Sequence, residues 1–142
     1  MNATLFLRIA AAVMLLHFTG HTLGAVLSGP QHGAAEIAVR AAMDSVHFDV
    51  MGAMRSYWDF YYGFAVALSA VLLAHAVLFW QFASLAKTAP AVIRPFMLLF
   101  IAEWIAFAVI DYQYFFIVPL VMSIVTVACC AAAYWWTAPR TA

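Results

Sequence analysis

Four long apolar stretches dominate this sequence and limit what it can fold into. They cover residues 4–27, 58–85, 95–111 and 116–136 of the 142-residue chain. A membrane-spanning helix needs about 20 mostly apolar residues, so these stretches are typical of transmembrane helices. Only 8% of the residues are charged, whereas a soluble domain carries about 25%. The sequence therefore predicts an all-α membrane protein, a single integral membrane domain in which four transmembrane helices form an antiparallel bundle.

The positively charged residues predict how the spans are oriented. With four spans, both termini lie on the same side of the membrane as the second loop. That side carries four positive residues, Arg8, Lys87, Arg94 and Arg140, and the other side carries two, Arg40 and Arg55. By the positive-inside rule we expect both termini in the cytoplasm, with the chain in a bacterial inner membrane. The zero formal net charge indicates no nucleic-acid partner.

The first loop has a helical pattern of its own over residues 33–50. Charged and polar side chains recur there at intervals of four, four and three residues, and apolar ones fill another face. This pattern predicts an amphipathic helix at the outer membrane surface, with Arg40 able to pair with Glu36 and Asp44. It is either a plain connecting helix or a lid over the bundle.

Polar residues within the first span raise the question of a site. His17 and His21 are four residues apart and share a stripe with Gly20 and Gly24, a GxxxG spacing that is typical of closely packed membrane helices. We therefore expect both histidines to face the bundle interior, and the span to be a retained helix and not a cleaved signal peptide. In the third span, Glu103 is costly to leave alone in lipid, and His17 is its natural partner.

The second and third spans supply further candidates. Asp59 begins a stripe of polar and small residues on the second span, and either pairs locally with Arg55 or lies at an outer mouth of the site. Asp111 lies at the outer end of the third span and is the other candidate mouth residue. By a step of about 100° per residue, His75 falls on the opposite side of the second span from Asp59. We therefore expect His75 to face lipid, another subunit or a cofactor.

Four interpretations of these polar residues stay open. His17, His21 and Glu103 form a catalytic or binding site, or they are buried hydrogen-bonding groups that fix helix packing. The two histidines can also chelate a metal ion, although no H-E-x-x-H motif is present. His17 and His75 lie at similar depths, as the two axial ligands of haem b would. We predict no cofactor. The adjacent Cys129 and Cys130 are interpreted as small packing residues.

The stretches "HFTGHTLG" and "SVHFDVMGAMRSYWDFYYGF" together support a family resemblance. With them, the chain resembles a family of small bacterial four-helix integral membrane proteins that has no established activity. The resemblance implies the four-span topology and transfers no catalytic residue.

The functional hypothesis follows from the polar residues inside an otherwise apolar chain. We expect a membrane protein that binds or transforms a small hydrophobic molecule, lipid-like or isoprenoid-like, at the histidine and carboxylate site. The alternatives are an accessory or scaffold subunit of a larger membrane complex, and a metal or haem carrier. The expected partners are the lipid bilayer, a hydrophobic small molecule, and a membrane protein partner or a second copy of the chain.

Overall fold

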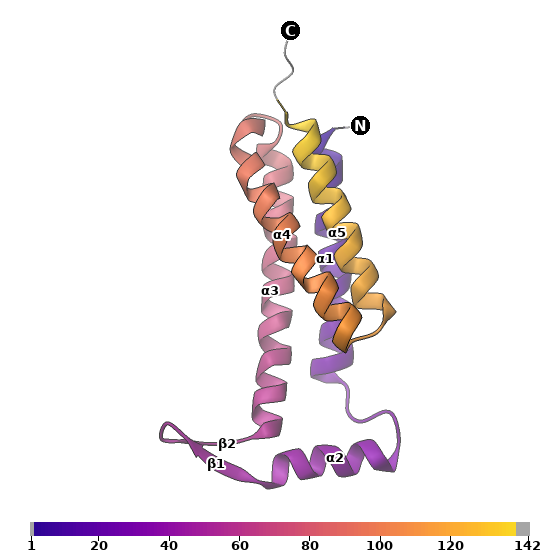
Figure 1. Ribbon diagram of the computed structural model, residues 1–142, viewed down its shortest axis with the longest axis vertical. Coiled ribbons are helices and arrows are strands. Elements are labelled where there is room, and N and C mark those ends of the chain that lie inside the picture. Colours follow the sequence, from indigo (N-terminus) through magenta and orange to yellow (C-terminus); the bar gives the residue numbers. More distant parts are fainter. Residues whose placement is uncertain (1, 139–142) are drawn as a thin grey trace. The chain divides into compact units, whose positions relative to one another are not determined.

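A computed structural model describes residues 2–138 and contains four helices long and apolar enough to cross a membrane. The first runs over Ala3–His21 (α1) and continues as a π-helix over Thr22–Leu27 (η1). The others are Tyr57–Leu85 (α3), Pro90–Tyr114 (α4) and Ile117–Trp136 (α5). Figure 1 labels these helices and colours them by their position in the sequence. The predicted spans are therefore confirmed in number and kind.

The third span is longer than the sequence indicated, because α4 begins at Pro90 and not at Pro95. Pro90 occupies the start of the helix, where a missing backbone N–H costs nothing. Pro95 lies inside the helix, and we had interpreted it as the first residue of the span. The extra residues place Glu103 about 20 Å from the beginning of α4 at 1.5 Å per residue, close to its middle.

Two compact units can be distinguished, one containing residues up to 17 and from 72 onward, the other containing residues 18–71. In the first unit, α5 folds back along α4 after a short connection (Figure 1). The Arg94 guanidinium, near the start of α4, donates a hydrogen bond of 2.9 Å to the Tyr134 carbonyl near the end of α5. The Arg8 guanidinium lies 3.3 Å from the centre of the Trp80 ring. The Arg94 guanidinium also lies 4.0 Å from the centre of the Tyr134 ring, so both arginines make cation–π contacts.

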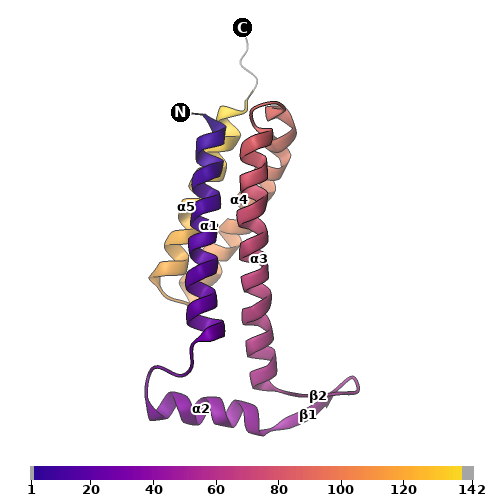
Figure 2. The same ribbon diagram turned by 180° about the vertical axis from the view of Figure 1, so that it is seen from behind.

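The second unit contains the only strands found in the described residues. Helix α2 covers Ala34–Ser45, and a hairpin of β1 (His47–Val50) and β2 (Ala53–Ser56) leads into α3 (Figure 2). The amphipathic helix is confirmed, but its predicted end at residue 50 is wrong. The last residues form a strand instead, because Met51 and Gly52, both with positive φ, make a two-residue turn that pairs β1 with β2.

The charged residues of α2 pair differently from the prediction. Glu36 accepts hydrogen bonds of 2.6 Å from the backbone N–H groups of Gln31 and His32, which satisfies donors just before the helix. The Arg40 guanidinium lies 4.3 Å from the centre of the Trp58 ring. Arg40 therefore anchors α2 to the start of α3, and the expected ion pairs with Glu36 and Asp44 are not formed among the described residues.

The buried faces of the long helices agree with the prediction for the first part of α1 and not for α3. On α1, the buried residues Leu7, Ala10 and Met14 recur at intervals of three and four, and the same interval leads to His17. On α3, the buried set includes Leu72 and His75, so the predicted orientation of His75 is wrong. The predicted interior face rests on polar residues near the ends of the helix, where headgroups and water also accept them.

The GxxxG spacing does not mark a close helix contact within the described chain. A Cβ atom added at Gly20 or Gly24 would meet no heavy atom within 4 Å. Gly24 also lies in η1, whose turns are wider than those of an α-helix, so the step of 100° per residue no longer applies there. The predicted stripe is therefore interrupted from Gly20 onward.

Candidate functional site

The central feature of the first unit is a histidine and carboxylate pair between α3 and α4. The His75 Nε2 atom lies 3.6 Å from the Glu103 Oε1 atom. The His75 side chain is 10% exposed, whereas Glu103 keeps 33% of its side-chain exposure. The distance exceeds the 2.7–2.9 Å of a charge-assisted hydrogen bond. The two groups therefore face each other without closing into a tight ion pair.

Aromatic rings surround His75 on the buried side. The Phe100 ring meets it edge-on at 5.3 Å between centroids, and the Trp104 ring meets it edge-on at 5.7 Å. Phe79 lies one turn along α3 at 6.2 Å. Trp104 is the largest fully buried side chain in the described residues. The His75 ring therefore has aromatic rings on one side and the partly exposed Glu103 carboxylate on the other.

His17 reaches the same group of rings from α1. Its ring centroid lies 6.3 Å from that of Trp104. His17, His75 and Glu103 all lie about 15–21 Å along their helices from the ends that carry Arg8 and Arg94, at 1.5 Å per residue. Two of the expected participants, His17 and Glu103, are thus near Trp104 and its neighbours. The partner that the structure gives to Glu103 is His75.

Two predicted site residues, His21 and Asp59, lie in the second unit, where they make hydrogen bonds to the backbone. The His21 Nε2 atom lies 3.0 Å from the Ala65 carbonyl oxygen on α3. Asp59 accepts a hydrogen bond of 2.8 Å from the Ser56 backbone N–H, and the Ser56 hydroxyl accepts one of 3.1 Å from the Asp59 backbone N–H. This reciprocal pair is a capping box at the start of α3. The alternative pairing of Asp59 with Arg55 is not formed among the described residues.

Asp111 lies in the first unit and connects α4 to α5. The Ser123 hydroxyl donates a hydrogen bond of 2.6 Å to its Oδ2 atom, and Asp111 is only 6% exposed. Asp111 was expected near the mouth of a site, and the structure gives it a buried partner on the neighbouring helix.

The part of the chain that the structure describes contains no assembled metal site and no bonded cysteine pair. No three side chains of the His, Cys, Asp and Glu types are placed to hold a metal ion there. Cys129 and Cys130 are both buried and unbonded to each other, in agreement with their interpretation as packing residues.

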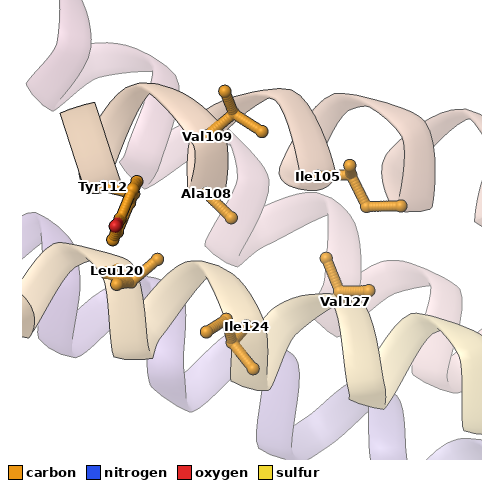
Figure 3. Close-up of a pocket in the computed structure, with 7 residues that line it drawn as sticks. All are labelled: Ile105, Ala108, Val109, Tyr112, Leu120, Ile124 and Val127. Carbon is orange, nitrogen blue, oxygen red and sulfur yellow. The ribbon is translucent and has the colours of Figure 1, made fainter.

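An apolar groove lies between α4 and α5, with a volume of about 440 Å³ (Figure 3). It is lined by Ile105, Ala108, Val109, Tyr112, Leu120, Ile124 and Val127. None of the predicted site residues is among them. The groove offers dispersion contacts to a lipid chain or a neighbouring helix, and Tyr112 is the one lining residue with a polar side-chain group.

The sequence prediction missed His75 and Trp104, although one signal pointed to them. On α3, Leu72, His75 and Phe79 are spaced by three and four, and on α4 the buried residues Phe100 and Trp104 are spaced by four. Choosing the phase from large apolar residues in mid-helix would have placed His75 inside.

In comparisons with known proteins, no family model, no curated protein and no solved structure matched the chain. The family resemblance inferred from the two sequence stretches stays a prediction.

Proposed function

We propose that this chain is an integral protein of a bacterial cytoplasmic membrane that binds a small hydrophobic molecule by its polar end, at the His75–Glu103 pair. The observation that carries this proposal is the partial exposure of Glu103. Its side chain keeps a third of its accessible surface near the middle of an apolar helix. A charged group facing lipid at that depth costs several kcal/mol. A bound molecule with a polar end would cover the carboxylate.

The surroundings of the pair suit such a ligand. Small-molecule sites are mostly apolar, with a few polar groups that fix orientation. Phe79, Phe100 and Trp104 supply aromatic surface, and His75 and Glu103 supply the polar groups. If the bound molecule is also transformed, the same pair is the proton donor and acceptor, since a histidine beside a carboxylate is suited to acid–base chemistry.

The proposal includes the antiparallel four-helix bundle with cytoplasmic termini. It is supported by the arginines at the helix ends. Arg8 near the start of α1 stacks on Trp80 near the end of α3, and Arg94 near the start of α4 stacks on Tyr134 near the end of α5. Both are on the side predicted to be cytoplasmic. Arg140, also counted for that side, lies outside the described residues. A reporter fused after residue 142 should be active only if it is a type that works in the cytoplasm. Activity of a periplasmic reporter would reverse the orientation.

The binding function is tested by native mass spectrometry of the protein purified in a gentle detergent. We expect a co-purified hydrophobic molecule on the wild-type chain and a loss of about fivefold or more in its affinity in Glu103→Gln, since this change removes the charge that faces and orients His75. Glu36→Gln is the matched control, because Glu36 is the other glutamate of the chain and lies on α2. Equal occupancy in all three proteins would contradict the proposal. Co-purification of another membrane protein in place of a small molecule would favour the accessory-subunit alternative.

A further inference from the structure

Two buried polar atoms beside the His75–Glu103 pair have no hydrogen-bond partner among residues 2–138. They are the Nε1 atom of Trp104 and the Nδ1 atom of His75. Trp104 is 1% exposed and His75 is 8% exposed, so bulk water does not supply the missing bonds. Leaving such a group unsatisfied in the interior is destabilising, because the hydrogen bonds that it makes to water in the unfolded chain are not replaced. A molecule that bonds both atoms would recover this free energy.

The two atoms have opposite hydrogen-bonding roles. An indole nitrogen carries a hydrogen and can only donate. The Glu103 carboxylate, 3.6 Å from the His75 Nε2 atom, favours the neutral tautomer that carries its proton on Nε2. The Nδ1 atom of that neutral tautomer has a free lone pair and accepts. The site therefore offers one donor and one acceptor on rings whose centroids are 5.7 Å apart.

We propose that the ligand of this site is a hydrophobic alcohol or phenol, whose hydroxyl oxygen accepts from Trp104 Nε1 and whose hydroxyl hydrogen is donated to His75 Nδ1. This inference rests on the proposed binding function and specifies the ligand's polar end. A hydroxyl is the smallest group that both donates and accepts. A ketone or an ether accepts from Trp104 and leaves the Nδ1 lone pair without a donor. An alkane satisfies neither ring.

The proposed hydroxyl lies among aromatic rings. Phe79 and Phe100 also contact the His75 ring, at 6.2 and 5.3 Å between centroids, so aromatic carbon borders the polar end of the ligand. Rejection of analogues that lack a required hydrogen-bonding group is strong in such surroundings, because the protein's buried atom is then left unpaired. The ratio of the affinities for an alcohol and for its ether should therefore be larger than the ratio that one solvent-exposed hydrogen bond provides.

The test compares four matched probes on the purified protein in detergent: a long-chain alcohol, its methyl ether, its ketone and its alkane. Tritiated probes give the bound fraction at equilibrium. We expect the alcohol to bind at least fivefold more tightly than the ether and the ketone, which is the factor that a hydrogen bond of about 1 kcal/mol provides. Trp104→Phe keeps an aromatic ring and removes the donor, so it should reduce alcohol binding by about fivefold. Trp80→Phe is the matched control, since Trp80 is 57% exposed and stacks on Arg8.

A second measurement reads ligand binding on the wild-type protein and uses Trp104→Phe only to assign one signal. The chain has five tryptophans, so ¹⁵N-tryptophan labelling gives five indole N–H signals in the wild-type protein. We expect the alcohol to shift one signal downfield, the one that is missing from Trp104→Phe. The alkane should leave it in place.

The outcomes separate this inference from the function it rests on. If alcohol, ether and ketone bind equally and all are weakened by Glu103→Gln, the binding function holds and the hydroxyl assignment is wrong. Tighter binding of the ketone than of the alcohol would mean that His75 donates, and would also overturn the assignment. If no probe binds and Glu103→Gln has no effect on the co-purified material, the proposed function itself fails. An unchanged Trp104 signal with every probe, with a bridging water as its only partner, would likewise contradict the inference.

Discussion

Replacing Ser123 by alanine should destabilise the contact between α4 and α5 by an amount that the structure allows us to bracket. The hydroxyl donates to the Asp111 carboxylate at 2.6 Å, within the range for a charge-assisted O–H···O⁻ bond. Ser123 is fully buried and Asp111 is 6% exposed, so water cannot take the place of the hydroxyl. Hydrogen bonds to charged groups contribute about 1.5–3 kcal/mol in soluble proteins, whereas those between membrane helices average about 0.6 and reach about 1.7 kcal/mol.

We expect Ser123→Ala to cost about 1.5 kcal/mol, close to the upper end of the membrane range. The bond is charge-assisted and desolvated, and within the described chain Ser123 is the side chain that bonds this carboxylate. The assay is reversible unfolding in mixed micelles, followed by tryptophan fluorescence. Thr126→Val is the matched control, because Thr126 is equally buried but its hydroxyl bonds the Met122 carbonyl on its own helix.

A double-mutant cycle with Asp111→Ala identifies the source of the loss. If the bond is the cause, Ser123→Ala should cost little once the carboxylate is gone, and the coupling should be about 1 kcal/mol. Additive losses within about 0.5 kcal/mol, or a loss no larger than that of Thr126→Val, would refute the reasoning.

Three further predictions concern the second unit. The backbone N–H of His32, with that of Gln31, holds the pKa of the Glu36 carboxyl below its usual value of 4.5, against the opposing effect of partial burial. Because the pKa is lower in the folded state, this stabilisation of α2 is present above pH 4.5 and disappears as the pH falls through the folded value. Hydrogen exchange of the α2 amides should show that loss in the wild type and not in Glu36→Gln. Gly52→Ala should destabilise the hairpin by about 1 kcal/mol, since φ is +88° there, and exchange of the β1–β2 amides measures it. His21→Phe should cost about 1 kcal/mol of unfolding free energy by removing the bond to the Ala65 carbonyl, and an unchanged midpoint in mixed micelles would contradict that role.

The number of spans and the inner face of α1 could be predicted from the sequence because both depend on local hydrophobicity. Length and apolar composition decide whether a helix can cross a membrane. The predicted face is correct for the first part of α1, where small and large apolar residues recur at helical intervals through Ala10 and Met14, and wrong at Gly20 and Gly24, which are exposed. These features need no knowledge of any other segment.

The rotation of α3 could not be predicted in the same way, because polarity has two meanings in a membrane helix. Near the ends, residues such as Asp59 and Ser84 are polar because headgroups are near, and Asp59 is used for capping. In the middle of the helix, a polar residue indicates the buried face, and on α3 that residue is His75. Because the prediction gave equal weight to both regions, it assigned the wrong face of α3 to the interior. The end of α2 was missed for a different reason: the turn at Met51 requires a non-glycine residue at φ +54°, which helical periodicity does not reveal.

Helix α4 contains two carboxylates, and the contrast between them is the strongest argument for a binding site. Asp111 is almost completely buried and accepts a hydrogen bond of 2.6 Å from the neighbouring helix. Glu103, eight residues earlier, keeps a third of its side-chain exposure and lies 3.6 Å from its histidine. If both served only to hold helices together, both should be closed in the same way, since an unsatisfied carboxylate is costlier toward the middle of a membrane than near its surface. The costlier position has the looser pairing. That order is expected when one carboxylate stabilises the fold and the other is kept available for a ligand.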